Sequence, residues 1–226
     1  MPTALVLGAS RGLGLEFVRQ YRADGWRVVA AARSAEGVEA LKALGAEAHQ
    51  IDLTDAAAVA ALGWKLDGES FDVAIYNAGV IGPRTEGAQP VAQPEFDAVM
   101  HTNVLGPMMA LPLLLPFVET GNHGRGGVLA ILSSKMGSIG GMDTNGAWMY
   151  RISKAAANAV LKSVSLDARH AICVALHPGW VQTDMGGPNA DLTPQQSVTG
   201  MRRTLAGLTH NDNGSFHNYD GAAIPW

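Results

Sequence analysis

Cysteine is almost absent from the sequence, and long apolar runs are missing. The single cysteine, Cys173, has no partner for an intramolecular disulfide, and its apolar neighbours predict a buried strand position. We therefore expect a protein of the reducing cytoplasm. No basic segment precedes the first apolar run, and the longest apolar segment, residues 107–118, is shorter than the roughly 18 residues that a membrane span requires. We expect this segment to be a buried helix and predict no membrane contact.

Basic residues are too few and too scattered for a polyanionic partner. The chain carries 16 Lys and Arg against 20 Asp and Glu, a net charge of −4, so nothing predicts a positive patch for nucleic acid. The seven histidines lack the paired helical spacing of a metal site, and no cysteine cluster accompanies them. His177 is interpreted as a strand-end residue. We therefore expect no metal and take the partner to be a small molecule.

Short β-branched or aliphatic runs alternate with helix-length segments along the chain. Strands are predicted at residues 3–7, 27–32, 46–50, 71–76, 127–132 and 172–177, with a short one near Phe216. Helices are predicted at 13–23, 35–44 and 54–62, the last capped by Thr54. The strand runs are continuous rather than alternating in polarity, as expected of strands covered on both faces. We predict one α/β domain, residues 1–226, with a Rossmann-like, doubly wound, mostly parallel seven-stranded sheet between helical layers.

A glycine-rich turn follows the first predicted strand. Residues 8–14 read Gly-Ala-Ser-Arg-Gly-Leu-Gly, and a helical pattern comes after them. The glycines let the backbone turn sharply and approach a pyrophosphate, which then lies on the amides of the helix N-terminus. A turn that only packs a helix on a strand is the alternative, but three glycines at this junction favour a dinucleotide site. Its candidate residues are Gly8, Ser10, Arg11, Gly12, Leu13 and Gly14.

Charge at the second strand end predicts which dinucleotide binds. An NAD site needs a carboxylate there to hold the ribose 2′-hydroxyl, whereas an NADP site needs cations for the 2′-phosphate. Here the second strand ends in three alanines and Arg33, and Arg11 stands inside the glycine loop. The alternative is that both arginines are ordinary solvated surface residues. That interpretation is reasonable for either arginine alone but less so for both at these two places. We predict NADP(H) as the preferred cofactor, with NAD(H) as the second choice.

A tyrosine and a lysine four residues apart offer acid–base chemistry. Tyr150 and Lys154 begin an alanine-rich segment, where this spacing places both side chains on one helix face. A free tyrosine has a pKa of about 10, and a nearby ammonium lowers that pKa by favouring the phenolate. The pair would give a proton to a carbonyl oxygen in reduction and accept one in oxidation. The same spacing occurs in ordinary amphipathic helices. Whether this pair is catalytic is therefore judged from its position relative to the other motifs along the chain.

The order of these motifs resembles the short-chain dehydrogenase/reductase family over almost the whole chain. Asn77-Ala78-Gly79 closes the fourth predicted strand and is similar to the family's Asn-Asn-Ala-Gly, with Tyr76 in place of the first Asn. Asp52 and Leu53 resemble the pair that meets the adenine ring, although a loop aspartate that starts a helix would look the same. Residues 133–139 (Ser-Ser-Lys-Met-Gly-Ser-Ile), the Tyr150-Arg151-x-Ser153-Lys154 motif and the ending at 221–226 most resemble the small bacterial C-factor-like branch of carbonyl reductases.

The resemblance also implies roles near the nicotinamide. Asn103 would anchor a proton-relay water, and Lys154 would also bind the nicotinamide ribose. After the sixth strand, Pro178-Gly179-Trp180-Val181-Gln182-Thr183 resembles the family's Pro-Gly-x-Val-x-Thr. In that family this turn holds the nicotinamide carboxamide, here through Thr183 and the backbone of Val181. An ordinary strand-end turn is the alternative for this segment.

One serine is expected to hold the substrate oxygen, and its identity is open. Ser134 lies sixteen residues before Tyr150, where many family members have thirteen. Ser138, twelve residues before Tyr150, and Ser133 are the competing candidates. We prefer Ser134 because it ends the fifth strand, where the family carries its serine.

The resemblance implies an NADPH-dependent carbonyl reductase acting on an aldehyde, ketone or quinone. A regulatory or signalling protein that only binds NADP(H) is one alternative, and a sugar-nucleotide epimerase or dehydratase is another that this short chain disfavours. A homodimer or homotetramer is expected from the family, paired through two long helices near residues 95–118 and 148–169. An apolar, adaptable substrate pocket is expected from a set of large side chains, namely Met136, Met142, Trp148, Met149, Trp180 and Met185.

Overall fold

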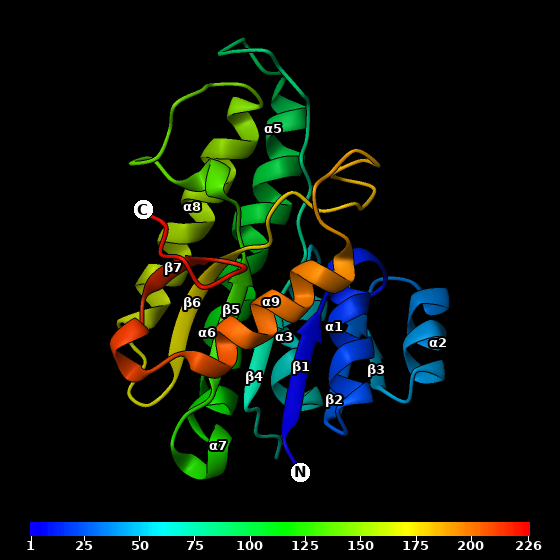
Figure 1. Cartoon of the computed structure of the whole chain (residues 1–226). Helices are drawn as coiled ribbons and strands as arrows, with labels where there is room; N and C mark the ends of the chain where they lie inside the picture. The colour runs from blue at the N-terminus through cyan, green and yellow to red at the C-terminus, as the bar shows by residue number, and fades with distance from the viewer.

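A single parallel sheet forms the centre of the computed structural model, which describes residues 1–226 (Figure 1). Its strands are β1 (Thr3–Leu7), β2 (Arg27–Ala32), β3 (Glu47–Gln50), β4 (Val73–Tyr76), β5 (Val128–Leu132), β6 (Ile172–His177) and β7 (Ser215–Asn218). They lie in the order β3-β2-β1-β4-β5-β6-β7, and all neighbouring pairs are parallel. The chain winds outward from β1 in one direction and then returns to β4 and winds in the other. The predicted doubly wound sheet is confirmed.

Helices cover both faces of the sheet (Figure 1). They are α1 (Gly12–Ala23), α2 (Ala35–Ala43), α3 (Ala56–Ala60), α4 (Leu62–Lys65), α5 (Gln93–Met100), α6 (Gly106–Glu119), α7 (Gly121–Gly124), α8 (Trp148–Ser165) and α9 (Pro194–Gly207). Successive residues of a strand point to opposite faces. Leu5 and Leu7 of β1 therefore pack with α6 and α8, whereas Ala4 and Val6 pack with α1 and α9. Two apolar cores result, one on each side of the sheet.

Local capping explains where the helices begin. The Ser34 hydroxyl accepts a hydrogen bond from the Gly37 amide and starts α2. Asp55 caps α3 by accepting from two first-turn amides, so the prediction that Thr54 is the cap is wrong. Thr54 instead donates its amide and its hydroxyl to Asp52. The helix predicted at 54–62 is divided into the short helices α3 and α4, with Ala61 between them.

The predicted buried helix at 107–118 is part of a much longer one. α5, a π-helical turn at His101–Leu105 and α6 form one continuous helix, Gln93–Glu119, of 27 residues. Its most apolar 18-residue window has a mean hydropathy of 1.4, so the helix is long and apolar enough to cross a membrane, and 39% of that window is buried. The apolar segment at 107–118 is thus the second half of the long helix that the family resemblance implied near residues 95–118, and Pro112 and Pro116 stay inside it. Ala110, Leu111 and Leu114 face the core, as in a helix that covers a sheet.

Candidate active site

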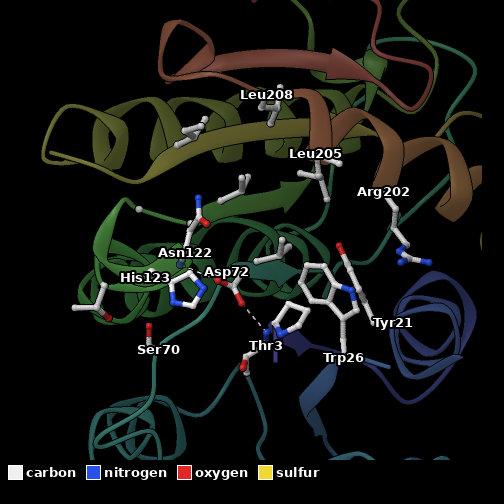
Figure 2. A pocket seen from close by; sticks show the side chains of 18 of the residues that line it. Thr3, Tyr21, Trp26, Ser70, Asp72, Asn122, His123, Arg202, Leu205 and Leu208 are labelled. Atoms are coloured by element: carbon white, nitrogen blue, oxygen red, sulfur yellow. Dashed lines mark hydrogen bonds between the residues drawn. The ribbon is translucent and has the colours of Figure 1, made fainter. Parts of the chain in front are cut away.

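Two large cavities lie at opposite ends of the sheet. The larger, of about 620 Å³, lies at the amino ends of the strands and is lined by Tyr21, Trp26, Asp72 and His123 among others (Figure 2). The Asp72 carboxylate accepts hydrogen bonds there from the amides of Thr3 and Asn122, so it ties chain segments together. None of the predicted site residues lines this cavity. The predicted residues gather instead at the carboxyl ends of the strands.

At the carboxyl ends, two adjoining cavities share Leu13, Ser133, Tyr150, Pro178, Thr183 and Met185. We call the one of about 460 Å³ the substrate cavity, because Ser134, Tyr150 and Trp180 line it. The one of about 360 Å³ is the nucleotide cavity, lined by Arg11, Gly12, Asn77, Gly79 and Lys154. Parallel sheets bind ligands at this edge, where the strand order reverses. The geometry therefore puts the glycine loop and the Tyr-x-x-x-Lys pair at one site.

The glycine loop is shaped for close approach of another group. Gly8 and Gly12 have φ of +78° and +54°, a region that favours glycine. A β-carbon on Gly14 would collide with the carbonyl oxygen of Gly8 and would lie 2.7 Å from Nδ2 of Asn77. Nδ2 of Asn77 also donates to that Gly8 oxygen at 2.7 Å. Asn77 thus fixes the glycine loop from the end of β4.

The N-terminus of α1 has no cap of its own. Arg11 makes no side-chain capping bond, and the first turn holds no acidic residue. The amides of Gly12 and Leu13 donate to no backbone carbonyl outside the helices and strands. Such open amides, together with the helix dipole, attract an anion such as a pyrophosphate. The residues present therefore fit a dinucleotide.

Arg11 and Arg33 are both exposed but have different surroundings. The Arg11 guanidinium pairs with Asp184 at 2.9 Å, and both side chains are nearly four-fifths exposed. Arg33 forms no ion pair within 4 Å and lies outside the nucleotide cavity, near Asp52. Hydrogen bonds from Thr54, aided by Arg33, hold the pKa of Asp52 below its usual value. Asp52 thus holds a local turn ahead of α3, whose cap is Asp55, and buried Leu53 lies outside both cavities.

Tyr150 and Lys154 lie one turn apart on α8, as the spacing predicts. Both are almost fully buried, and the Lys154 ammonium lies 5.8 Å from the centre of the Tyr150 ring. Lys154 donates to the carbonyl oxygen of Leu132 at 2.8 Å, which holds it at the end of β5. A β-carbon on Gly79 would lie only 3.2 Å from Nζ of Lys154. Glycine at 79 therefore leaves the space that Lys154 occupies.

Burial determines the titration of both groups. It raises the pKa of Tyr150 to about 12, opposed only by a hydrogen bond with Ser134. It also lowers the pKa of the Lys154 ammonium to about 8. The expected lowering of the tyrosine pKa by lysine is not found in this state of the protein. Tyr150 is therefore a protonated hydrogen-bond donor over the whole physiological range.

The three candidate serines have different partners. Ser133 donates to Oδ1 of Asn158 in the core. Ser138 donates to the carbonyl oxygen of Pro225 at 2.5 Å and accepts from the Gly141 amide at 3.0 Å. Its hydroxyl is therefore already engaged both as a donor and as an acceptor. Ser134 accepts from the Met136 amide and faces Tyr150 across the substrate cavity. Only Ser134 has its hydroxyl directed to the tyrosine.

Asn103 lies in the π-helical turn of the long helix and is 1% exposed. Its Oδ1 accepts from the Val80 amide at 2.8 Å, and its Nδ2 donates to the Val80 carbonyl at 2.8 Å and to Ser153 at 2.9 Å. A β-carbon on Gly79 would lie 3.4 Å from this Oδ1. Asn103 therefore lies on the same side of Gly79 as Lys154, as a shared proton path requires.

The turn after β6 closes over the glycine loop. Gly179 has a φ of +82°, and the Pro178 carbonyl oxygen accepts from Ser197 of α9 at 2.6 Å. Thr183 lies close to Gly12: a β-carbon on Gly12 would be 3.5 Å from the Thr183 methyl group. Val181 pairs with Leu192 in an isolated bridge. The turn thus forms one wall of both cavities.

Several lining residues of the substrate cavity were not anticipated. Of the expected apolar set, only Met136, Trp180 and Met185 line it. Four charged residues also do so, namely Arg84, Lys135, Asp143 and Arg151. No motif distinguishes them in the sequence, since they come from the β4–α5 connection, the β5–α8 connection and α8, which the fold brings together. The cavity is therefore more polar than predicted.

Tyr76, which replaces the first Asn of the family motif, is fully buried, and its hydroxyl packs against Gly106 without a hydrogen-bond partner. Burial raises its pKa. The residue therefore fills the core under the long helix and does not reach either cavity at the carboxyl ends of the strands.

Comparisons with known proteins agree with this geometry. Among curated relatives, C-signal of Myxococcus xanthus is 41% identical over 157 residues, which cover 69% of this chain and 92% of that protein. 1-Hydroxy-2-glutathionyl-2-methyl-3-butene dehydrogenase of Rhodococcus sp. strain AD45 is 31% identical, and the match covers 100% of both chains.

Solved structures are also similar over their full length. Carbonyl reductase Sniffer of D. melanogaster has a TM-score of 0.90 and 31% identity, with 100% of both chains covered. NADPH-bound carbonyl reductase from chicken fatty liver has a TM-score of 0.86 and 30% identity, with 100% of this chain and 99% of that one covered. The family model for short chain dehydrogenases matches residues 2–192. The chain therefore belongs to the short-chain dehydrogenase family, as its motif order predicted.

Proposed function

We propose that the protein is an NADPH-dependent reductase of aldehydes, ketones or quinones. The observation that carries this proposal is the joint placement of Tyr150, Lys154 and Ser134 at cavities that adjoin the glycine loop. A protein that only binds the nucleotide has no need of this set. The similarity to carbonyl reductases of known structure supports the same reaction.

The nucleotide cavity would hold the cofactor. The open amides at Gly12 and Leu13 suit the pyrophosphate, and the turn at Pro178, Gly179, Val181 and Thr183 suits the nicotinamide end. When bound, the nicotinamide supplies the hydride. Lys154 would hold the nicotinamide ribose. Asn77 and Gly79 keep the floor of the cavity in place, because Asn77 is bonded to the glycine loop.

The side chains of the substrate cavity would carry out the proton transfer. Tyr150 donates its phenolic proton to the carbonyl oxygen, and the Ser134 hydroxyl holds that oxygen by a second hydrogen bond. Burial dominates the pKa of Tyr150 before the reaction; the Lys154 ammonium would act on the phenolate as it forms during proton transfer, when an opposite charge nearby favours the ionised tyrosine. The phenolate would then regain its proton from the Lys154 ammonium, and Asn103, on the Lys154 side of Gly79, would anchor the water that returns a proton to Lys154.

Preference for NADPH over NADH is tested by charge reversal. Arg33 forms no ion pair within 4 Å, whereas Arg11 is paired with an exposed Asp184 that a phosphate can replace at little cost. We expect Arg33→Asp to raise the KM for NADPH at least tenfold while the KM for NADH changes by less than twofold. Lys65→Asp, on the distant α4, is the control. Equal effects on both cofactors would rule out the assignment of Arg33.

A second candidate function is regulation or signalling through bound NADP(H), and the 41% identity to C-signal is the observation that favours it. NADPH oxidation measured over a panel of aldehydes, ketones and quinones separates the two. Turnover of any carbonyl supports the reductase. Silence on the whole panel together with tight NADPH binding would replace the reductase with the regulator.

We also propose that residues 1–226 act as one catalytic domain in the cytoplasm, as a homodimer or homotetramer. Large apolar side chains are exposed on the long helix and on α8, namely Phe96, Leu105, Met108, Leu113 and Ile152. Contiguous exposed apolar surface commonly marks a protein interface. These two helices are the segments expected to pair.

A further inference from the structure

The substrate cavity carries a surplus of positive charge that the rest of the chain does not share. Arg84, Lys135 and Arg151 line it, and Asp143 is the only acidic residue that does. The chain as a whole has four more acidic than basic residues. None of the four lining residues forms an ion pair within 4 Å, although six other pairs exist in the protein. The cavity therefore holds cations without counter-charges.

Arg151 is the most unusual of these cations. It directly follows Tyr150 on α8 and is only 9% exposed. Its Nε donates to the Gly146 carbonyl oxygen at 2.9 Å, and its Nη2 donates to the Thr144 hydroxyl. Both partners are neutral, and Nη1 makes no hydrogen bond within the protein. Buried arginines are normally paired with an anion, because removing the charge from water is costly.

Lys135 brings a second charge to the same wall. It is exposed, forms no hydrogen bond or ion pair with another side chain, and follows Ser134 directly. Its charge also acts on His177, whose pKa is lowered to about 4 by burial and then by Lys135. His177 is therefore a neutral wall residue, and its buried Nδ1 has no partner. The positive charge of the cavity comes from the lysine and the arginines alone.

Arg84 places a third cation at the cavity from a different segment. Its Nη2 donates to the Met185 carbonyl oxygen at 2.7 Å, which links residues 81–84 to the loop after β6. The three cations thus come from separate parts of the chain and line the cavity that holds Tyr150 and Ser134. A purely apolar substrate would leave all three without a counter-charge when it displaced water.

We propose that the substrate of this site is a carbonyl compound that carries a carboxylate, and that Arg151, Lys135 and Arg84 bind the carboxylate while Tyr150 and Ser134 bind the carbonyl oxygen. Arginine matches the planar, two-oxygen shape of a carboxylate, and a lysine adds a flexible point charge. This inference rests on the proposed reductase activity, because it names the substrate class of the same cavity.

Three benzaldehydes whose para substituents are anionic, neutral and cationic test the inference. They are 4-formylbenzoate, its methyl ester and 4-(trimethylammonio)benzaldehyde, and kcat/KM is measured by NADPH oxidation. We expect the anion to exceed the ester by at least tenfold and the cation to be the poorest substrate. Because charge attraction is screened by salt, the advantage of the anion should shrink severalfold in 0.5 M NaCl.

Lys135→Gln is the informative variant, because Arg151 also holds the turn at 144–146 and its loss could disturb the fold. We expect Lys135→Gln to reduce the anion-to-ester ratio at least threefold. Lys65→Gln, which removes the same charge outside the cavity, should leave the ratio unchanged. Equal rates for the anion and the ester, or a ratio that Lys135→Gln does not alter, would overturn the inference and leave the reductase intact. Reduction of none of the three, with no other carbonyl reduced either, would mean that the proposed function itself is wrong.

Discussion

Burial raises the pKa of Tyr150 and lowers the pKa of Lys154, the two titratable groups of the acid pair. It keeps Tyr150 protonated, with a pKa of about 12, and makes Lys154 easier to deprotonate, with a pKa of about 8. Both shifts disfavour the charged form. The tyrosine is therefore ready to donate at neutral pH, while the lysine is the group whose charge changes first as the pH rises.

This order of titration predicts the pH dependence of carbonyl reduction. Below pH 8 Lys154 is mainly charged, so kcat/KM should be level between pH 6 and pH 7. Above pH 8 the ammonium is lost and the rate should fall, although Tyr150 is still protonated. Lys154→Arg keeps its charge at high pH and should delay the fall by at least one pH unit. An identical profile for the variant and the parent protein would contradict this account.

Single substitutions of Ser134 and Ser138 test which serine holds the substrate oxygen. Ser134→Ala should lower kcat about a hundredfold, the usual cost of losing one hydrogen bond to a developing oxyanion. Ser138→Ala should instead lower the free energy of unfolding by about 2 kcal/mol, because it removes two buried hydrogen bonds. Turnover and urea unfolding of both variants check this. Loss of turnover in Ser138→Ala alone would reverse the assignment.

At the scale of elements, the strands were more predictable than the helices. β1, β2 and β6 begin and end at the predicted residues, since parallel strands buried on both faces give continuous, mainly apolar runs. The apolar pattern marks only the second half of the long helix, because its first half, from Gln93 to the π-helical turn, is polar enough to resemble a loop. The family resemblance, and not the pattern, implied a helix near residues 95–118. Thr54 was mistaken for a cap because Asp55 beside it offers an equally suitable oxygen.

The exposed side of the long helix predicts assembly. Met108 is 53% exposed there, next to other apolar side chains. A glutamate at this position would place a charge inside a buried interface, which is costly. We therefore expect Met108→Glu to convert the oligomer to monomers, measured by light scattering at micromolar concentration. Trp64→Glu, at a 70% exposed position on α4, should leave the mass unchanged. A parent protein that is itself monomeric would contradict the proposal.

At the scale of the molecule, the position of the site follows from topology and its lining does not. Motifs that end strands β1, β4, β5 and β6 must meet at one edge of a parallel sheet, so the sequence predicts that Gly12, Asn77, Ser134 and Pro178 come together. No comparable rule predicts from the sequence which loops contact one another. The Arg11–Asp184 pair and the Arg84–Met185 bond join residues more than 100 positions apart, and neither was foreseen.

The central claim is that the protein reduces carbonyl groups with Tyr150 as the proton donor. Its most direct test is Tyr150→Phe, which removes one hydroxyl and keeps the ring that fills the site. The kcat for the best carbonyl substrate should fall between a hundredfold and ten-thousandfold, the range for loss of a general acid, while the dissociation constant of NADPH changes less than threefold. A variant that retains more than a tenth of the parent turnover would contradict the account.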